Sequence, residues 1–289
     1  MIKRLIKYIL LFPTHIFKIA FQVYEKIISG IFPQLKGALR QPFIDYVDND
    51  KKLTLYDSAS FYLYTPNEIC IFRHSTFSSK EPEMLNWIEE YGGGVFFDIG
   101  ANIGIYSLYY TQAKDGNVYS FEPSVFNLRQ LAKNISINEV SDRISIIPNP
   151  LSDVTGINLF KNGSMDEGGA LSAFGVEYGY DNMPIESNIN YSVMGFSLDD
   201  LFDKNILRET PSLIKIDVDG IEHLILKGAS KTLQSDSLKS IFIEVNDEFE
   251  EQSSQVKAVL EATGFKLKDK QHADMFRTST VFNQIWIKQ

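Results

Sequence analysis

Apolar and polar residues follow two different patterns along the chain. Between residues 51 and 80, short alternating runs such as "KLTLYDSASFYLYT" and "EICIFRH" predict two or three β-strands. From residue 95 onwards, apolar runs of strand length alternate with segments that have helical spacing. This order predicts an α/β fold with a mostly parallel sheet, helices on both of its faces, and ligands at the carboxyl ends of its strands.

The predicted sheet is interrupted once. After the runs "VFFDIG", "GNVYSFEP" and "RISIIPNPLSD", the pattern breaks over residues 161–194, which are rich in Gly, Asn and Ser and contain scattered aromatic residues. An inserted loop of this length is usually a lid or recognition segment, or else disordered, and the aromatic residues favour a lid. The strand pattern resumes with "LIKIDVDG" and "SIFIEVN" and closes near "FKLKDK" and "NQIWIKQ".

Charge separates the start of the chain from the rest. Residues 1–40 carry seven Lys or Arg and a single acid, Glu25, whereas the remainder carries 21 basic and 36 acidic side chains, a net charge of -15. We therefore expect a basic amphipathic helical segment over residues 1–40, a β-rich extension over 41–80 and the α/β domain over 81–289. The acidic domain argues against a nucleic acid as partner, because nucleic-acid binding depends on neutralised phosphates.

The first 30 residues are apolar as well as basic. Their longest uncharged stretch runs from Tyr8 to Phe17 and includes Pro13, whereas a membrane-spanning helix needs about 20 apolar residues. No small-residue cleavage site of the kind that ends a signal peptide follows this stretch. The segment is therefore expected to be an amphipathic helix, which either makes peripheral contact with anionic lipid or packs on the body or on a second subunit. Its basic residues are Lys3, Arg4, Lys7, Lys18 and Lys26.

The bulk composition narrows the class of protein. With 289 residues and 44% hydrophobic content, the chain is long enough for one large α/β domain and an N-terminal extension. The single cysteine, Cys70, cannot form an internal disulfide and belongs to no CxxC or zinc pattern. This favours a reducing compartment such as the cytoplasm and leaves the oligomeric state open.

Two acids and a glycine turn mark the ends of the first two strands of the domain. Asp98 ends the first strand, and Gly100, Asn102 and Gly104 form the turn that follows. The turn lacks the third glycine of the dinucleotide fingerprint, and Asp98 would repel a pyrophosphate there. Glu122 ends the second strand, where an acid accepts hydrogen bonds from ribose hydroxyls. Asp98 alone could be a helix cap and Glu122 alone a surface acid, but together they favour a nucleoside with a cationic tail, such as S-adenosylmethionine.

Six segments, in this order, resemble the FkbM-type S-adenosylmethionine-dependent methyltransferase family. They are "FFDIGANIGIYSLY", "VYSFEPSVFNLRQLAKNISIN", "IIPNPLSD", "FSLDDL", "LIKIDVDGIEHLILKGA" and "IFIEVN", and the similarity runs from about residue 81 to about residue 246. The resemblance implies a Rossmann-like class I methyltransferase fold with a seven-stranded sheet. It also implies O-methylation of hydroxyls on sugars, glycans or other secondary metabolites.

The resemblance also implies roles for individual residues. The family's usual D-V-E-G-x-E is "DVDGIE" here, so Asp219 keeps the acid but shortens its reach. The implied contacts are Asp98, Gly100, Asn102 and Gly104 at the methionine end of the cofactor, Glu122 at the ribose, and Asn149, Pro150 and Leu151 at the border of the adenine.

A sugar hydroxyl has to lose its proton during methylation, which calls for a base near the acceptor oxygen. The candidates from adjacent strand ends are Asp217, His223 and Glu244, although a lone histidine at a helix start is often a packing residue. Asp217, Asp219 and Glu222 with His223 are also compatible with Mg²⁺ or Ca²⁺. Capping of the helix by Asp219 needs no metal, and we assign no metal ligand here.

The sequence favours an S-adenosylmethionine-dependent O-methyltransferase that acts on a hydroxyl of a saccharide, a glycan or a related metabolite and that the basic segment brings to a membrane. Two alternatives remain open. One is an NAD-dependent oxidoreductase on a Rossmann sheet, against which the incomplete glycine fingerprint and Asp98 both count. The other is a non-catalytic methyltransferase-like protein whose basic segment and long loop bind partners, against which the presence of both Asp98 and Glu122 counts.

Overall fold

The chain forms two compact units in a computed structural model. It describes residues 2–272 and 279–289, with side chains described from residue 10 onwards. One unit ends at Asp50 and the other spans Lys51–Gln289. The sequence predicts boundaries near residues 40 and 80 instead. The structure differs because apolar side chains between residues 51 and 80 are buried in the core of the larger unit.

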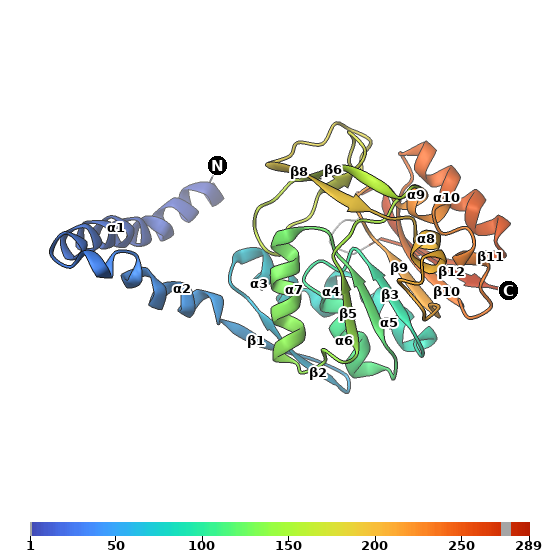
Figure 1. The fold of residues 1–289 in the computed structure, drawn as a ribbon, viewed down its shortest axis with the longest axis horizontal. Coiled ribbons are helices and arrows are strands. Elements are labelled where there is room, and N and C mark those ends of the chain that lie inside the picture. The colour runs from blue at the N-terminus through green and yellow to red at the C-terminus, as the bar shows by residue number, and fades with distance from the viewer. Residues whose placement is uncertain (1, 273–278) are drawn as a thin grey trace. The chain divides into compact units, whose positions relative to one another are not determined.

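The larger unit is built around a seven-stranded sheet (Figure 1). Its strands, in spatial order, are β11 (Phe265–Gln271), β12 (Val281–Lys288), β10 (Ser240–Asn246), β9 (Leu213–Ile216), β3 (Phe96–Ile99), β4 (Val118–Phe121) and β5 (Ile144–Ile147). The strands from β10 to β5 run parallel, and β12 and β11 are antiparallel to their neighbours. The predicted α/β fold with a seven-stranded, mostly parallel sheet is therefore confirmed.

Helices cover both faces of this sheet (Figure 1). Each strand serves both layers, because successive side chains point to opposite faces. In β3, Phe96 packs into one layer and Phe97 into the other, and both are fully buried. The first layer contains α5 (Pro82–Tyr91), α6 (Ile105–Ala113) and α7 (Val125–Ile137), and the second contains α8 (Leu198–Asp203), α9 (Glu222–Lys227) and α10 (Glu250–Ala262).

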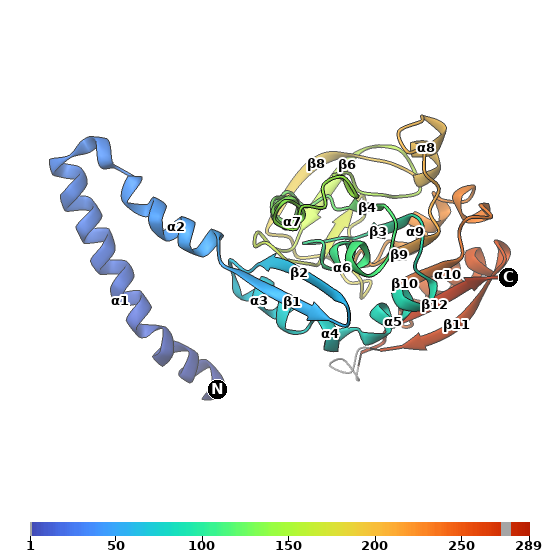
Figure 2. The same cartoon turned by 90° about the horizontal axis from the view of Figure 1, so that it is seen from below.

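A β-hairpin precedes the sheet in the chain and extends the first layer. It consists of β1 (Lys51–Tyr56) and β2 (Ala59–Tyr64), which pair antiparallel. β2 packs against α6 and α7 (Figure 2). Two of its own side chains, Phe61 and Leu63, are fully buried in this contact. The hairpin is therefore part of the core of the larger unit.

The extension that the sequence predicts to be β-rich contains more helix than strand. Besides the hairpin, it holds α2 (Gln41–Asp48), α3 (Glu68–Ser75) and α4 (Phe77–Lys80). The prediction of a strand over "EICIFRH" is wrong. The Asn67 side chain accepts a hydrogen bond from the Cys70 N–H and caps α3, and a short apolar run by itself does not distinguish a strand from a helix.

The inserted segment over residues 161–194 is more regular than the sequence predicts. It contributes to a three-stranded antiparallel sheet of β6 (Gly156–Asn162), β7 (Ser172–Phe174) and β8 (Ile189–Gly195). The pairing of β6 with β8 joins the two ends of a long segment. A local sequence pattern does not reveal such a distant pairing, so the segment resembles a loop in the sequence alone.

The unit that ends at Asp50 is helical. It contains α1 (Ile2–Ile31), two short 3₁₀ helices (Pro33–Leu35 and Ala38–Arg40) and α2. The Arg40 guanidinium donates two hydrogen bonds to the Glu25 carboxylate, each at 2.6 Å. The Phe43 ring of α2 meets the Phe21 ring of α1 edge-on, with centroids 4.9 Å apart. These contacts join α2 to α1 within this unit.

The predicted helix at the start of the chain is present. The side chains of Lys3, Arg4 and Lys7 lie outside the described residues. Across the described ranges, no helix is both long enough and apolar enough to cross a membrane.

Candidate active site

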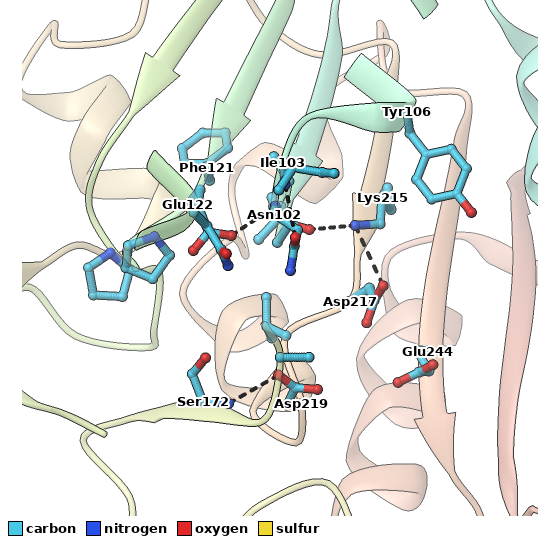
Figure 3. A pocket seen from close by; sticks show the side chains of 18 of the residues that line it. Asn102, Ile103, Tyr106, Phe121, Glu122, Ser172, Lys215, Asp217, Asp219 and Glu244 are labelled. Atoms are coloured by element: carbon cyan, nitrogen blue, oxygen red, sulfur yellow. Dashed lines mark hydrogen bonds and ion pairs between the residues drawn. The ribbon is translucent and has the colours of Figure 1, made fainter. Parts of the chain in front are cut away.

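A pocket opens at the carboxyl ends of β3, β4 and β9 (Figure 3). The empty space in and around it is about 1280 Å³ when the solvent at its open mouth is counted. The lining residues come from the turns after β3 and β9, the end of β4 and the segment after β5, with further side chains from α3, α4, α6 and β10. The pocket therefore lies where open α/β sheets bind ligands.

The turn after β3 has a backbone that few residue types adopt. Gly100, Asn102 and Gly104 have positive φ angles of 82°, 52° and 83°. A Cβ on Gly100 would overlap the carbonyl oxygen of Asp217, and a Cβ on Gly104 would overlap Leu131 of α7. Gly100 and Asn102 line the pocket, whereas Gly104 packs beneath it. The glycines therefore allow the turn to pass close to β9 on one side and α7 on the other.

The Glu122 carboxylate is held against this turn. The Asn102 N–H donates to Oε2 and the Ser124 N–H donates to Oε1, each at 2.8 Å. Glu122 is almost fully buried, and burial raises its pKa to about 7. Each carboxylate oxygen keeps a lone pair for one more donor. Glu122 therefore fits the two hydroxyls of a ribose in the pocket.

The charge of Asp98 is compensated inside the protein. The side chain is fully buried and accepts a hydrogen bond from the Ser107 hydroxyl at 2.6 Å. The Lys215 ammonium lies 3.2 Å from its other oxygen. The sequence predicts that Asp98 meets the cofactor directly, but Asp98 does not line the pocket, because the neighbouring strand β9 supplies a lysine as its partner.

Lys215 is a buried cation that lines the pocket (Figure 3). Its ammonium donates to the Gly100 carbonyl at 2.8 Å and lies 3.6 Å from a carboxylate oxygen of Asp217. Burial alone would lower the pKa of Lys215, but Asp98 and Asp217 raise it above its ordinary value. Lys215 is absent from the residues predicted from the sequence, although a lysine inside the apolar run "LIKIDV" is a signal that could have found it.

Three carboxylates face the pocket at the ends of β9 and β10. Asp217 and Asp219 follow β9, and Glu244 extends from β10 beside Asp217 (Figure 3). Burial and the negative charges of Asp217 and Glu81 raise the pKa of Glu244 well above its ordinary value. Burial and the charge of Asp217 raise the pKa of Asp219 to about 6. This end of the pocket therefore either holds a proton or attracts a positive charge near neutral pH.

A second polar group borders the same end. The Tyr106 hydroxyl donates to the Glu81 carboxylate at 2.6 Å, and Glu81 also pairs with Lys80. Burial raises the pKa of Tyr106 well above its ordinary value, so its hydroxyl stays protonated. All three residues line the pocket, and none of them is among the predicted site residues, because no local pattern directs them to the sheet edge.

The segment after β5 borders the pocket beyond Glu122. Asn149, Pro150 and Leu151 all line it, and the Asn149 amide donates to the Met194 carbonyl at 2.9 Å. The structure thus brings these three residues near the expected ribose acid. Their contact with an adenine stays a prediction.

His223 does not reach the pocket. α9 begins at Glu222 and directs the His223 ring into the interior, where it meets the Phe249 ring edge-on at a centroid distance of 5.9 Å. Burial lowers the pKa of His223, and its Nδ1 has no hydrogen-bond partner within the described part of the chain. This placement corrects the expectation that His223 is a candidate base. The other two candidates, Asp217 and Glu244, line the pocket.

The acids after β9 are not arranged around a metal. Glu222 is buried, and its Oε1 accepts from the N–H groups of Val218 and Gly220 at 3.1 and 3.3 Å. Its Oε2 accepts from the Gln252 amide at 2.5 Å. Glu222 therefore holds the turn rather than facing the pocket. In the two described ranges, no group of three His, Cys, Asp or Glu side chains is placed to hold a metal ion.

A segment over residues 163–171, here termed the covering segment, contributes Gly169 and Ala170 to the pocket lining. The Asn102 amide donates to the Gly169 carbonyl at 2.7 Å. The Asp219 carboxylate accepts from the last N–H of the segment at 2.7 Å and from the next N–H in the chain at 3.1 Å. The covering segment is thus joined to both turns that form the pocket.

Helix α3 and the residue before it hold the covering segment from another direction. Arg73 donates to the Gly168 carbonyl at 2.7 Å, and the Asn67 amide donates to the Glu167 carbonyl at 3.0 Å. The Glu167 side chain is paired with Arg129 at 2.8 Å. These contacts place the segment where a lid would lie, and its role as a lid stays a prediction.

Much of the larger unit matches a known protein family. Residues 98–267 match the Methyltransferase FkbM domain family, and no curated protein matches the chain. One similar solved structure is methyltransferase FkbM from Methylobacillus flagellatus KT, with a TM-score of 0.44, 16% identity, and coverage of 66% of this chain and 42% of that chain. This chain therefore spans less than half the length of that protein.

Two further solved structures are similar to this chain. They are Aeropyrum pernix fibrillarin with natively bound S-adenosyl-L-methionine (TM-score 0.47, 12% identity, 83% of this chain and 84% of that chain) and an rRNA methylase from Streptococcus thermophilus (TM-score 0.40, 13% identity, 70% and 92%). The family match covers more than half of the chain and includes the glycine turn, Glu122, Asp217 and Glu244. The chain therefore belongs to the FkbM methyltransferase domain family.

Proposed function

We propose that this chain is an S-adenosylmethionine-dependent O-methyltransferase that acts on a hydroxyl of a saccharide, a glycan or a related metabolite. The observation that carries the proposal is that one pocket combines the glycine turn, the Glu122 carboxylate and the carboxylates of Asp217 and Glu244. Membership of the FkbM family supports methyl transfer as the reaction. A saccharide acceptor is supported by Asp217, Asp219 and Glu244 at the ends of β9 and β10, because carboxylates accept several hydrogen bonds from hydroxyl groups.

The residues of the pocket fit this cofactor. When bound, S-adenosylmethionine supplies a methyl group on a positively charged sulfur. Glu122 would accept hydrogen bonds from the ribose, and the glycine turn, whose Gly100 and Asn102 line the pocket, would border the methionine end of the cofactor. Lys215 balances one of the two charges of Asp98 and Asp217, so one negative charge remains to attract a cationic group.

We propose Glu244 as the general base. As the methyl group leaves the sulfur of the cofactor for the acceptor oxygen, the Glu244 carboxylate would take the proton of that oxygen, so the pKa of this carboxyl has to lie near the working pH. Burial and the charge of Asp217 raise the pKa in that direction. Positioning in the pocket supplies much of the remaining acceleration, because the leaving group is already part of the cofactor.

We also propose a cytoplasmic location with peripheral contact at a membrane through residues 1–30. The single cysteine, Cys70, has no second cysteine in the chain to pair with, which supports a reducing compartment. The net charge of -9 argues against a nucleic acid as acceptor. Action on rRNA belongs to the Streptococcus thermophilus methylase, which is 13% identical to this chain, and it is not assigned to this chain.

Calorimetric titration with S-adenosylmethionine, S-adenosylhomocysteine and NAD tests the cofactor assignment. We expect the first two to bind, and Glu122→Ala to weaken both by about a hundredfold, since two hydrogen bonds to a charged group are lost. The matched control is Glu209→Ala, which removes an exposed glutamate that bonds Asn117 and Tyr119 outside the pocket. Binding of NAD alone would support the oxidoreductase, and binding of none by the folded protein would support the non-catalytic alternative.

Turnover measurements with saccharide acceptors test the base. Glu244→Gln is expected to lower kcat by at least about a hundredfold while the affinity for S-adenosylmethionine changes little, because only proton transfer is lost. Glu248→Gln, at an exposed position four residues further along, is the matched control. A kcat for Glu244→Gln equal to that of the control would rule out Glu244 as the base.

A further inference from the structure

The unit that ends at Asp50 exposes a continuous apolar stripe along α1. Six large apolar side chains recur at a spacing of three or four residues, which places them on one face of the helix. Each of them is between 52% and 64% exposed. The members of this stripe are Phe12, Ile16, Ile19, Val23, Ile27 and Ile31.

The face of α1 next to the apolar stripe is polar and basic. His15, Lys18, Gln22 and Lys26 recur at the same spacing, and all four are exposed. The acid on this helix, Glu25, is already neutralised by its two hydrogen bonds from Arg40. The described part of α1 therefore has one apolar face and one face of positive charge.

The apolar stripe is separate from the face that packs within this unit. α2 meets α1 through Phe43, whose ring contacts Phe17 and Phe21, and neither of these two belongs to the stripe. On α2 itself, Ile44 and Val47 add further exposed apolar surface. Soluble monomers rarely leave a large contiguous apolar patch in water, so this surface calls for an occupant.

We propose that the stripe binds in the plane of an anionic lipid surface, with the apolar side chains at the boundary of the acyl chains and the lysines at the headgroups. Residues 1–40 carry seven basic residues and one acid, which complements anionic headgroups. A symmetric pair of copies would instead bring two basic helices together with no free acid on either helix to compensate. A position of α1 across the bilayer does not fit, because no described helix is both long enough and apolar enough to cross a membrane.

This inference names the surface behind the membrane contact of the proposed function, and it does not depend on the reaction. The full chain is sedimented with vesicles of phosphatidylcholine alone and of phosphatidylcholine mixed with phosphatidylglycerol. We expect the chain to bind the mixed vesicles. Its affinity for phosphatidylcholine vesicles, and for the mixed vesicles in high salt, is expected to be lower by about tenfold or more.

Two triple variants separate the two faces of α1. Ile16→Asn, Ile19→Asn and Val23→Asn together are expected to weaken binding to mixed vesicles by at least about a hundredfold, because three apolar side chains that the lipid would cover are lost. The matched control places asparagine at His15, Gln22 and Ser29 on the neighbouring polar face, and it is expected to bind like the wild type.

The proposal is overturned if the wild type does not bind mixed vesicles, or if the stripe variant binds them as well as the control does. It is also overturned if light scattering shows a dimer that the stripe variant dissociates while neither protein binds lipid. Titration with S-adenosylmethionine in the same variants keeps the two proposals apart. The stripe variant is expected to bind the cofactor like the wild type, and failure of all forms to bind it would count against the reaction and not against the lipid surface.

Discussion

Lys215 compensates part of the negative charge beside the pocket. It is buried between Asp98 and Asp217 and donates to the Gly100 carbonyl, so it joins β9 to the glycine turn. A buried ion pair contributes little net stability while it is intact, but the loss of one partner leaves an uncompensated charge in a low dielectric. The pocket therefore depends on Lys215 for its shape as well as for its charge.

We expect Lys215→Met to lower the free energy of unfolding by about 3 to 5 kcal/mol, because it leaves the Asp98 carboxylate buried without a cation. The double variant Asp98→Asn with Lys215→Met removes that charge and is expected to recover much of the loss. Chemical denaturation measures both. Equal losses in the single and double variants would show that the charge pairing is not the cause.

The charge of Asp217 is expected to control the pH dependence of catalysis. Asp217 raises the pKa of Glu244, and a neighbouring negative charge disfavours ionisation. Asp217→Asn should therefore lower this pKa and move the acidic limb of the kcat profile to lower pH. Asp236→Asn, at an exposed position outside the pocket, is the control. An acidic limb that stays in place or moves to higher pH would contradict the assignment of Glu244 as the base.

At the scale of elements, the covering segment over residues 163–171 connects the two turns that form the pocket. Asn102 reaches it from the turn after β3, and Asp219 reaches it from the turn after β9. Asp219 has a φ of 64°, a conformation that Asp and Asn adopt more readily than other non-glycine residues. A ligand that displaces either turn would therefore also displace the segment.

Asp219→Ala is expected to loosen the covering segment, because two backbone N–H groups lose their acceptor. Amide hydrogen exchange over residues 163–172 should become faster by about tenfold, corresponding to a loss of roughly 1 to 2 kcal/mol in local stability. Asp219→Asn keeps an acceptor oxygen and the backbone preference, so it should exchange like the wild type. Equal exchange in both variants and the wild type would mean that other contacts hold the segment.

At the scale of the whole molecule, the chain divides into two compact units, and both clusters of buried apolar residues lie in the larger one. The buried apolar clusters of the larger unit contain residues from Ala59 onwards, and none from the unit that ends at Asp50. The pocket is likewise lined by residues from Arg73 to Glu244. Cofactor binding and lipid binding are therefore expected to reside in different units.

Removal of residues 1–50 tests this division. We expect the remaining chain to fold with a Tm within about 2 °C of that of the full chain and to bind S-adenosylmethionine with unchanged affinity, since its core is complete. It should no longer sediment with phosphatidylglycerol vesicles. An unfolded truncated chain would show that the first unit is needed for the stability of the second.

Local patterns in the sequence were enough to predict the sheet and part of the pocket. Apolar runs of strand length separated by helical spacing predict the parallel strands, because each pattern reflects which faces of an element are buried. Glycines at turn positions and acids at strand ends indicate the pocket edge, and Gly100, Asn102, Glu122, Asp217 and Glu244 do line it. These features depend on residues close together in the chain, so the sequence by itself determines them.

Only the tertiary structure decided how distant residues pair. It placed Lys215 beside Asp98, turned His223 into the interior toward Phe249, and paired β6 with β8 where the sequence predicts a loop. Each outcome depends on which elements become neighbours in the folded chain, and burial then sets the charge state of each group. A single sequence carries no direct record of such contacts, which is why the charge balance of the pocket was visible only in the folded protein.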